Sequence, residues 1–137
     1  MENLHRAKAL LETEGYTCVL CGGDAVYTSR HRGVRPLMEL LDTDVSSFSA
    51  ADTVVGRATA LLYCLLGIKR LYAKIISDTA LDVLNHHGIA VQWDTRVDYI
   101  VNRDGTGRCP MELATEHIKD PALAPDAIRK KIKELQG

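Results

Sequence analysis

The alternation of helical and β-rich segments between residues 49 and 93 constrains the fold more than any other feature of this sequence. Ser49 and Asp52 have the spacing of a capping box, in which an acid follows a serine three residues later. The stretch that they open carries apolar residues at helical spacing: Val54, Ala58, Leu61 and Leu65. We therefore expect a central, buried helix that begins at Ser49 and ends at Gly67.

Two β-rich segments follow this helix, and a second helical pattern lies between them. Residues 69–77 and 89–93 favour strands because both are rich in β-branched and aromatic residues. Residues 78–87 favour a helix that stops at Gly88. A succession of helix, strand, helix and strand with short links implies parallel strands joined by right-handed crossovers.

The flanking segments complete the expected fold. Residues 2–14 predict a helix, and residues 16–20 and 25–29 predict an N-terminal β-hairpin around the turn Cys-Gly-Gly-Asp. Further helices are expected over residues 36–41, 110–118 and 123–135. Because the hairpin adds antiparallel strands to the parallel ones, the expected class is α/β, a three-layer α/β/α sandwich around a mixed sheet.

Length and composition limit the domain count and the partners. A chain of 137 residues has room for one domain, residues 1–137, and its 46% hydrophobic content suffices for a core without a disulfide or metal. The formal net charge of −1 argues against nucleic acid and anionic membranes as partners. The first residues lack the apolar core of a secretory signal, and no apolar run approaches the roughly 20 residues of a membrane span. We expect a cytoplasmic protein with reduced cysteines.

Three motifs resemble those of a known family. They are GVRPL at residues 33–37, ADTVVGRA at residues 51–58 and NRDGTGRCPME at residues 102–112. Together with the order of elements after the hairpin, they resemble a small prokaryotic family of unknown function that is assigned to the cytidine-deaminase-like fold. The resemblance covers nearly the whole chain. It implies that fold and a homodimer, and it implies little about a reaction.

The zinc-binding pattern of that fold can be tested on the sequence. Zinc deaminases carry His or Cys two residues before a Glu at the start of the buried helix, and Pro-Cys-x-x-Cys after the next strand. In this register Val55 replaces the first ligand, Arg57 the catalytic glutamate, and Ser77 and Ala80 the two cysteines. Valine, serine and alanine supply no thiolate, imidazole or carboxylate, so the sequence predicts no metal and no cofactor.

Cys109 is the candidate catalytic nucleophile among the four cysteines. It precedes Pro110 at an expected helix start and follows an arginine-bearing loop, and both features favour a thiolate. The alternative is that this turn only begins a helix. A structural role is expected for Cys18 and Cys21, whose side chains point to opposite faces of a strand, and for Cys64, which lies among leucines.

The other candidates are expected to converge at the carboxyl ends of the strands. Arg57 keeps its charge and can bind a phosphate or carboxylate, although a surface arginine is the alternative. Asp52 and Glu112 are candidate catalytic acids, and each has an alternative role at a helix start. The predicted ligand-binding set also includes Ser77, Asn102 and Arg103.

Two functions remain open at this point. The first is a zinc-free protein of the deaminase-like fold that binds a small anionic or nucleotide-like ligand. In its enzymatic form Cys109 would permit acyl or glycosyl transfer. The second is a catalytically inactive, oligomeric interaction module on the same fold.

Overall fold

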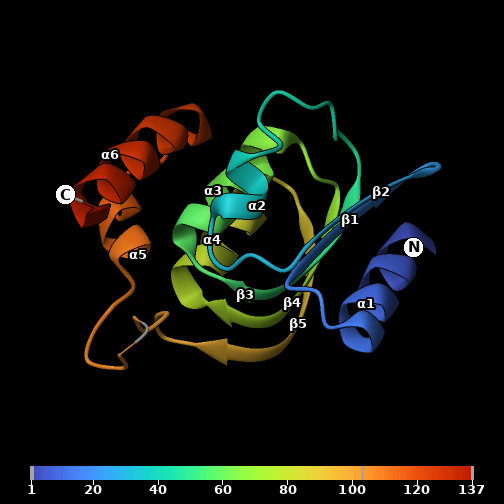
Figure 1. Ribbon diagram of the computed structural model, residues 1–137, viewed down its shortest axis with the longest axis horizontal. Coiled ribbons are helices and arrows are strands. Elements are labelled where there is room, and N and C mark those ends of the chain that lie inside the picture. Colours follow the sequence, from blue (N-terminus) through green and yellow to red (C-terminus); the bar gives the residue numbers. More distant parts are fainter. Residues whose placement is uncertain (1, 103, 137) are drawn as a thin grey trace.

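The computed structural model describes residues 2–102 and 104–136 (Figure 1). In chain order its elements are α1 (Glu2–Glu14), β1 (Cys18–Gly22), β2 (Ala25–Ser29), α2 (Arg35–Met38), β3 (Ser49–Val55), α3 (Arg57–Leu66), β4 (Arg70–Ser77), α4 (Asp78–His86), β5 (Ala90–Val97), α5 (Pro110–Thr115), the 3-10 helix η1 (Pro121–Leu123) and α6 (Ala124–Gln136). None of the helices in this part of the chain has the length and apolar character needed to cross a membrane.

The five strands form one mixed sheet in the order β2-β1-β3-β4-β5. Strand β1 runs antiparallel to both of its neighbours, so the predicted N-terminal hairpin is confirmed. Strands β3, β4 and β5 are parallel to one another, as short helical connections require. In this register Cys18 of β1 lies between Ser29 of the edge strand β2 and Asp52 of the central strand β3.

Helices cover both faces of the sheet, which gives three layers (Figure 1). On one face α1 buries Leu4, Ala7 and Leu11 against a small cluster that includes Val19 and Tyr72. The other face carries the larger core, in which α3 packs against α2, α4, α5 and α6. Side chains of a strand alternate between the two cores because successive residues point to opposite faces.

The expectation of one helix from Ser49 to Gly67 is wrong in its first half. Residues Ser49–Val55 form the central strand β3, and the helix begins only at Arg57. Since the strand is buried on both faces, Ala50 and Ala51 face different cores and the strand shows no alternation of polar and apolar residues. Asp52 therefore belongs to a strand, and the capping box does not form.

Most other elements lie within a few residues of their predicted ranges, although β1 is shifted by two residues and α2 ends three residues early, at Met38. Strand β4 and helix α4 differ from the prediction by one residue at one end, and α1 spans the predicted 2–14. Strand β5 is longer than expected, since it continues to Val97. The helix expected over residues 110–118 is α5, which ends at Thr115.

Candidate functional site

The side chain of Glu112 lies where three helices and a loop meet. Its Oε1 accepts hydrogen bonds from the backbone N–H of Arg57 at 3.1 Å and from the hydroxyl of Ser77 at 2.8 Å. Its Oε2 accepts a hydrogen bond from the backbone N–H of Ile100 at 3.2 Å. Arg57 is the first residue of α3 and Ser77 is the N-cap of α4, so this buried carboxylate connects α5 to the starts of both helices.

Gly56 allows Glu112 to approach α3 this closely. It is the N-cap residue of α3 and offers no side chain to the free N–H groups of the first turn. A Cβ built on Gly56 would lie 2.9 Å from Oε1 of Glu112 and 3.2 Å from Cγ1 of Ile100. Glu112 thus caps α3 from another part of the chain, and its negative charge suits the positive end of the helix dipole.

The guanidinium of Arg57 points toward the end of α5. Its Nε donates to the carbonyl oxygen of Thr115 at 2.8 Å, and one Nη donates to the carbonyl oxygen of Ile118. Thr115 is the last residue of α5 and Ile118 lies beyond it, so Arg57 binds the backbone where this helix ends. The guanidinium of Arg57 therefore already has two acceptors within the protein. The anionic group at the start of α3 is the Glu112 side chain, in the place where the sequence suggests a bound ligand.

The residues that the sequence predicts at a zinc position do not fit a zinc ion. Val55 ends β3 and Ala80 lies in the first turn of α4, and both are fully buried without a ligating atom. The Ser77 hydroxyl donates to Glu112 and accepts from the backbone N–H of Ala80 at 3.3 Å. Over the described ranges 2–102 and 104–136, no group of three or more His, Cys, Asp or Glu residues could hold a metal ion.

Cys109 is the N-cap residue of α5, as the sequence predicts, and it is half-buried. Its backbone N–H donates to the carbonyl oxygen of Ile100 at 2.8 Å. Asn102 shapes the preceding loop, because its Oδ1 accepts from the backbone N–H of Thr106 at 3.0 Å and its Nδ2 donates to the Thr106 hydroxyl at 3.1 Å. Arg103 lies outside the described residues.

Asp52 belongs to a separate, buried chain of hydrogen bonds. The hydroxyl of Tyr63, on α3, donates to Oδ2 of Asp52 at 2.6 Å. The same hydroxyl lies 3.3 Å from Sγ of Cys18, on β1. All three residues are at least nine-tenths buried, so the chain crosses the core from β3 to β1 without contact with bulk water.

Burial governs the acidity of these groups. It raises the pKa of Asp52 to about 7, and hydrogen bonds from Tyr63 and from the backbone N–H groups of Val54 and Thr53 oppose this rise. The pKa of the Cys18 thiol is raised by burial and by the nearby Asp52. The pKa of Tyr63 is raised in the same way. Among these three hydrogen-bonded side chains, Asp52 is therefore the one that titrates near neutral pH.

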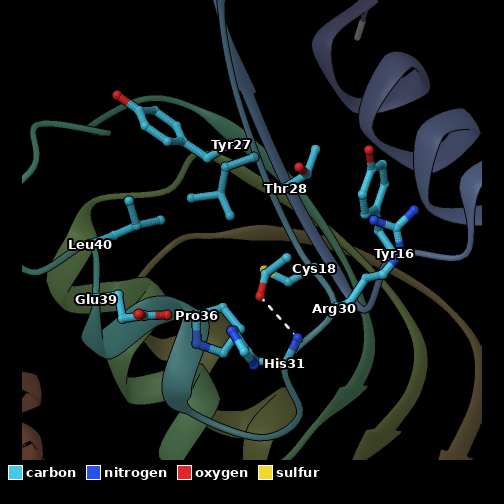
Figure 2. A pocket seen from close by; sticks show the side chains of 11 residues that line it. Tyr16, Cys18, Tyr27, Thr28, Arg30, His31, Pro36, Glu39 and Leu40 are labelled. Carbon is cyan, nitrogen blue, oxygen red and sulfur yellow. Dashed lines mark hydrogen bonds between the residues drawn. The ribbon is translucent and has the colours of Figure 1, made fainter.

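A pocket of about 410 Å³ lies beside this chain, between the hairpin and α2 (Figure 2). Cys18 and Leu20 line it from β1, and Pro36 and Leu40 line it from α2 and the turn that follows. Figure 2 shows Tyr27, Leu40, Pro36 and His31 around Cys18. Cys18 thus lines the pocket and also stands at the end of the hydrogen-bonded chain.

Charged and polar groups gather at the rim of the pocket. Arg30 stacks over the ring of Tyr16 at 4.3 Å, and one Nη donates to the carbonyl oxygen of Glu14. His31 and Glu39 are exposed and line the same pocket. Two basic side chains, Arg30 and His31, therefore line a cavity whose surface is both polar and apolar.

The structure joins some of the predicted residues and separates others. Arg57, Ser77 and Glu112 meet through direct hydrogen bonds. Asp52 instead bonds to Tyr63, and neither Tyr63 nor Cys18 was predicted to be functional. The available signal was a single phenol in a helix of alanines and leucines, because a buried Tyr hydroxyl needs a polar partner.

Comparison with solved structures places this arrangement in a known fold. A crystal structure of a DUF1893 family protein from Thermotoga maritima superimposes on it with a TM-score of 0.86. The alignment covers 95% of this chain and 90% of the other, at 23% sequence identity. The chain thus has the same mixed α/β fold, with helices around a five-stranded sheet.

The sequence itself identifies the family. Residues 6–132 match the family described as TM1506, domain of unknown function DUF1893, and the chain belongs to that family. None of the curated proteins matches the sequence.

Proposed function

We propose that this protein is a zinc-independent member of the cytidine-deaminase-like fold that binds a small anionic or nucleotide-like ligand. The order of α3, β4, α4 and β5 after an N-terminal hairpin supports the fold assignment. Zinc independence is supported by Val55 and Ala80, which cannot ligate a metal, and by Ser77, which is bonded to Glu112.

The pocket between the hairpin and α2 is the observation that carries the proposal. Its volume of about 410 Å³ falls in the range of small-molecule sites, roughly 300–1,000 Å³. Leu20, Pro36 and Leu40 offer apolar contacts to the flat body of a ligand. At the rim Arg30 offers positive charge, and His31 offers a ring N–H, to a phosphate or carboxylate.

This location differs from the one that the sequence suggests around Arg57. There the start of α3 already holds the Glu112 carboxylate, and the guanidinium already bonds to two carbonyls. A second anion beside Glu112 would meet like charge. At the hairpin pocket, by contrast, the described partners of the Arg30 guanidinium are a backbone carbonyl and an aromatic ring, and neither is an anion.

Amide chemical-shift mapping with uridine 5′-monophosphate, cytidine 5′-monophosphate and adenosine 5′-monophosphate tests the proposal. We expect saturable shifts at Leu20, Ser29, His31 and Leu40. Ser29→Tyr projects a ring into the pocket and should abolish them, whereas Thr95→Tyr on the other edge strand, β5, should not. The absence of shifts with all three nucleotides, or shifts centred on Arg57 and Glu112, would overturn the proposed pocket.

An oligomeric interaction module is the second candidate, and strand β5 favours it. This strand of eight residues lies at an edge of the sheet, is mostly exposed and carries Trp93 at 40% exposure. Unpaired edges and exposed aromatic residues are typical of sites where chains associate. Light scattering after size exclusion should show a dimer that Trp93→Arg dissociates, and a monomer at all concentrations would exclude this candidate.

A further inference from the structure

The hydrogen bonds that link Asp52, Tyr63 and Cys18 can point in either of two directions, and the proton on Asp52 decides which. A phenol has a single O–H proton, so Tyr63 can donate to only one of its two neighbours. Its neighbours are Oδ2 of Asp52 at 2.6 Å and Sγ of Cys18 at 3.3 Å. If both hydrogen bonds are to form, Tyr63 must donate to one neighbour and accept from the other.

When Asp52 is ionised, the direction is fixed toward the carboxylate. A carboxylate can only accept, so Tyr63 donates to Asp52. The Tyr63 oxygen is then free to accept from the Cys18 thiol. In this state the S–H proton points into the core, and the pocket meets a sulfur atom that can act only as a weak acceptor.

When Asp52 is protonated, the direction reverses. Oδ1 accepts from the backbone N–H of Val54 at 3.3 Å, so the proton belongs on Oδ2, which faces Tyr63. Asp52 then donates to Tyr63, and Tyr63 donates to the sulfur of Cys18. The S–H proton is released from the core and can be donated to a molecule in the pocket.

We infer that Cys18 is a specificity-determining contact of the pocket, and that it donates a hydrogen bond to a bound ligand when Asp52 is protonated. The inference rests on the proposed function and narrows the ligand class. The ligand should place an acceptor, such as a carbonyl oxygen or an unprotonated ring nitrogen, against Cys18. Binding of such a ligand is coupled to a proton on Asp52, two hydrogen bonds away.

Few other ionisable groups act on this proton. Asp52 faces Cys18 from β1 and Tyr63 from α3, and its partner on β4 is Ala73. Of the side chains that line the pocket, Arg30 and His31 are the basic ones and Glu39 is the acidic one. Because the imidazole of His31 lines the pocket itself, experiments on ligand binding use the His31→Gln background, so that the response of Asp52 is measured without it.

Infrared spectroscopy of the S–H stretch tests the chain without any ligand. The band that disappears in Cys18→Ala is assigned to Cys18, and it should shift between pH 5 and pH 9 with a midpoint near 7. Asp52→Asn is a matched mimic of the protonated acid, since its amide can donate to Tyr63 at every pH. Its band should stay at the acid position. A band that does not move in the wild type, or one that still titrates in Asp52→Asn, would overturn the inference.

Affinity for uridine 5′-monophosphate, which carries carbonyl acceptors, tests the coupling in the His31→Gln background. The Kd should rise about three- to tenfold from pH 6 to pH 8.5, the worth of one ordinary hydrogen bond. This rise should be lost when Asp52→Asn is added, which leaves only the pH dependence of the ligand's own phosphate, whose second pKa is about 6. Binding with the same pH dependence in both proteins contradicts the inference, whereas a complete lack of binding contradicts the proposed function and leaves the infrared result to decide on the chain.

Discussion

Glu112 caps a helix that begins 55 residues before it in the sequence, by accepting the backbone N–H of Arg57 at 3.1 Å. The two residues are joined a second time, since the Arg57 side chain bonds to carbonyls at the end of the helix that carries Glu112. The start of α3 and helix α5 are thus joined by two separate hydrogen bonds. A third hydrogen bond, from Ser77 to Glu112, holds α5 beside the carboxyl end of β4.

Replacing Glu112 should therefore cost stability. Glu112→Ala leaves the N–H groups of Arg57 and Ile100 and the hydroxyl of Ser77 without their acceptor. We expect a loss of about 2–4 kcal/mol in the free energy of unfolding, because each buried donor left unpaired is costly. Urea denaturation measures it.

The matched control for this prediction is Glu116→Ala. Glu116 is the C-cap residue of α5, and its exposed carboxylate lies 3.9 Å from Arg108. Its loss should change stability by less than about 0.5 kcal/mol. If both variants unfold at the same urea concentration, Glu112 does not cap α3.

A methyl group on Gly56 should act through the same carboxylate. In Gly56→Ala the new Cβ would meet Oε1 of Glu112 at 2.9 Å, so we expect a loss of about 1–3 kcal/mol. Gly107→Ala is the control, because a Cβ there meets no atom within 4 Å. In a double-mutant cycle the cost of Gly56→Ala should shrink when Glu112 is already alanine, and purely additive losses would show that the two sites are independent.

The sequence predicts elements well where periodicity is clear. Helix α4 alternates buried and exposed faces, and its N-cap Ser77 and terminal Gly88 mark its ends, so its range is predicted to within one residue. Strand β3 escapes prediction because both of its faces are buried, and because Ser49 and Asp52 happen to match a capping box. A local pattern cannot distinguish a buried strand from the first turns of a buried helix.

For the candidate site, the sequence predicts some of the residues involved but not the contacts that they make. Glu112 and Ser77 are both expected near the strand ends, yet their contact depends on how a loop and α5 fold back over α3. The Cys18–Tyr63 contact spans 45 positions and follows from sheet register and helix packing. No local pattern reports such contacts, since they arise only once the layers have assembled.

The thiols should differ sharply in reactivity. Burial raises the pKa of Cys64 to about 11 and raises the pKa of Cys18 and of Cys21. Cys109 is half-buried at the start of α5, whereas Cys18 and Cys21 are buried. We expect iodoacetamide at pH 7 to label Cys109 first, as peptide mass mapping would show, and Cys109→Ser should remove this fast phase. Equally slow labelling of all four cysteines would exclude Cys109 as a nucleophile.

The stability of the protein should fall as the pH rises through the range in which Asp52 ionises. The pKa of Asp52 is about 7 in the folded protein and near 3.8 in the unfolded chain. Because the folded pKa is the higher one, the folded state holds its proton longer, and this contribution is complete below about pH 4 and lost by about pH 7. The integrated loss is up to about 4 kcal/mol.

Comparison with Asp52→Asn isolates this contribution from the other carboxyl groups. The wild type minus variant difference in unfolding free energy, measured in urea from pH 4 to pH 8, should decline with rising pH and level off above about 7. Asp44→Asn is the control of opposite sign, since hydrogen bonds from Ser46 lower the pKa of this exposed acid. Its contribution is present above the unfolded pKa and lost as the pH falls. A wild type minus Asp52→Asn difference that stays constant from pH 4 to pH 8 would mean that Asp52 titrates alike in the folded and unfolded states.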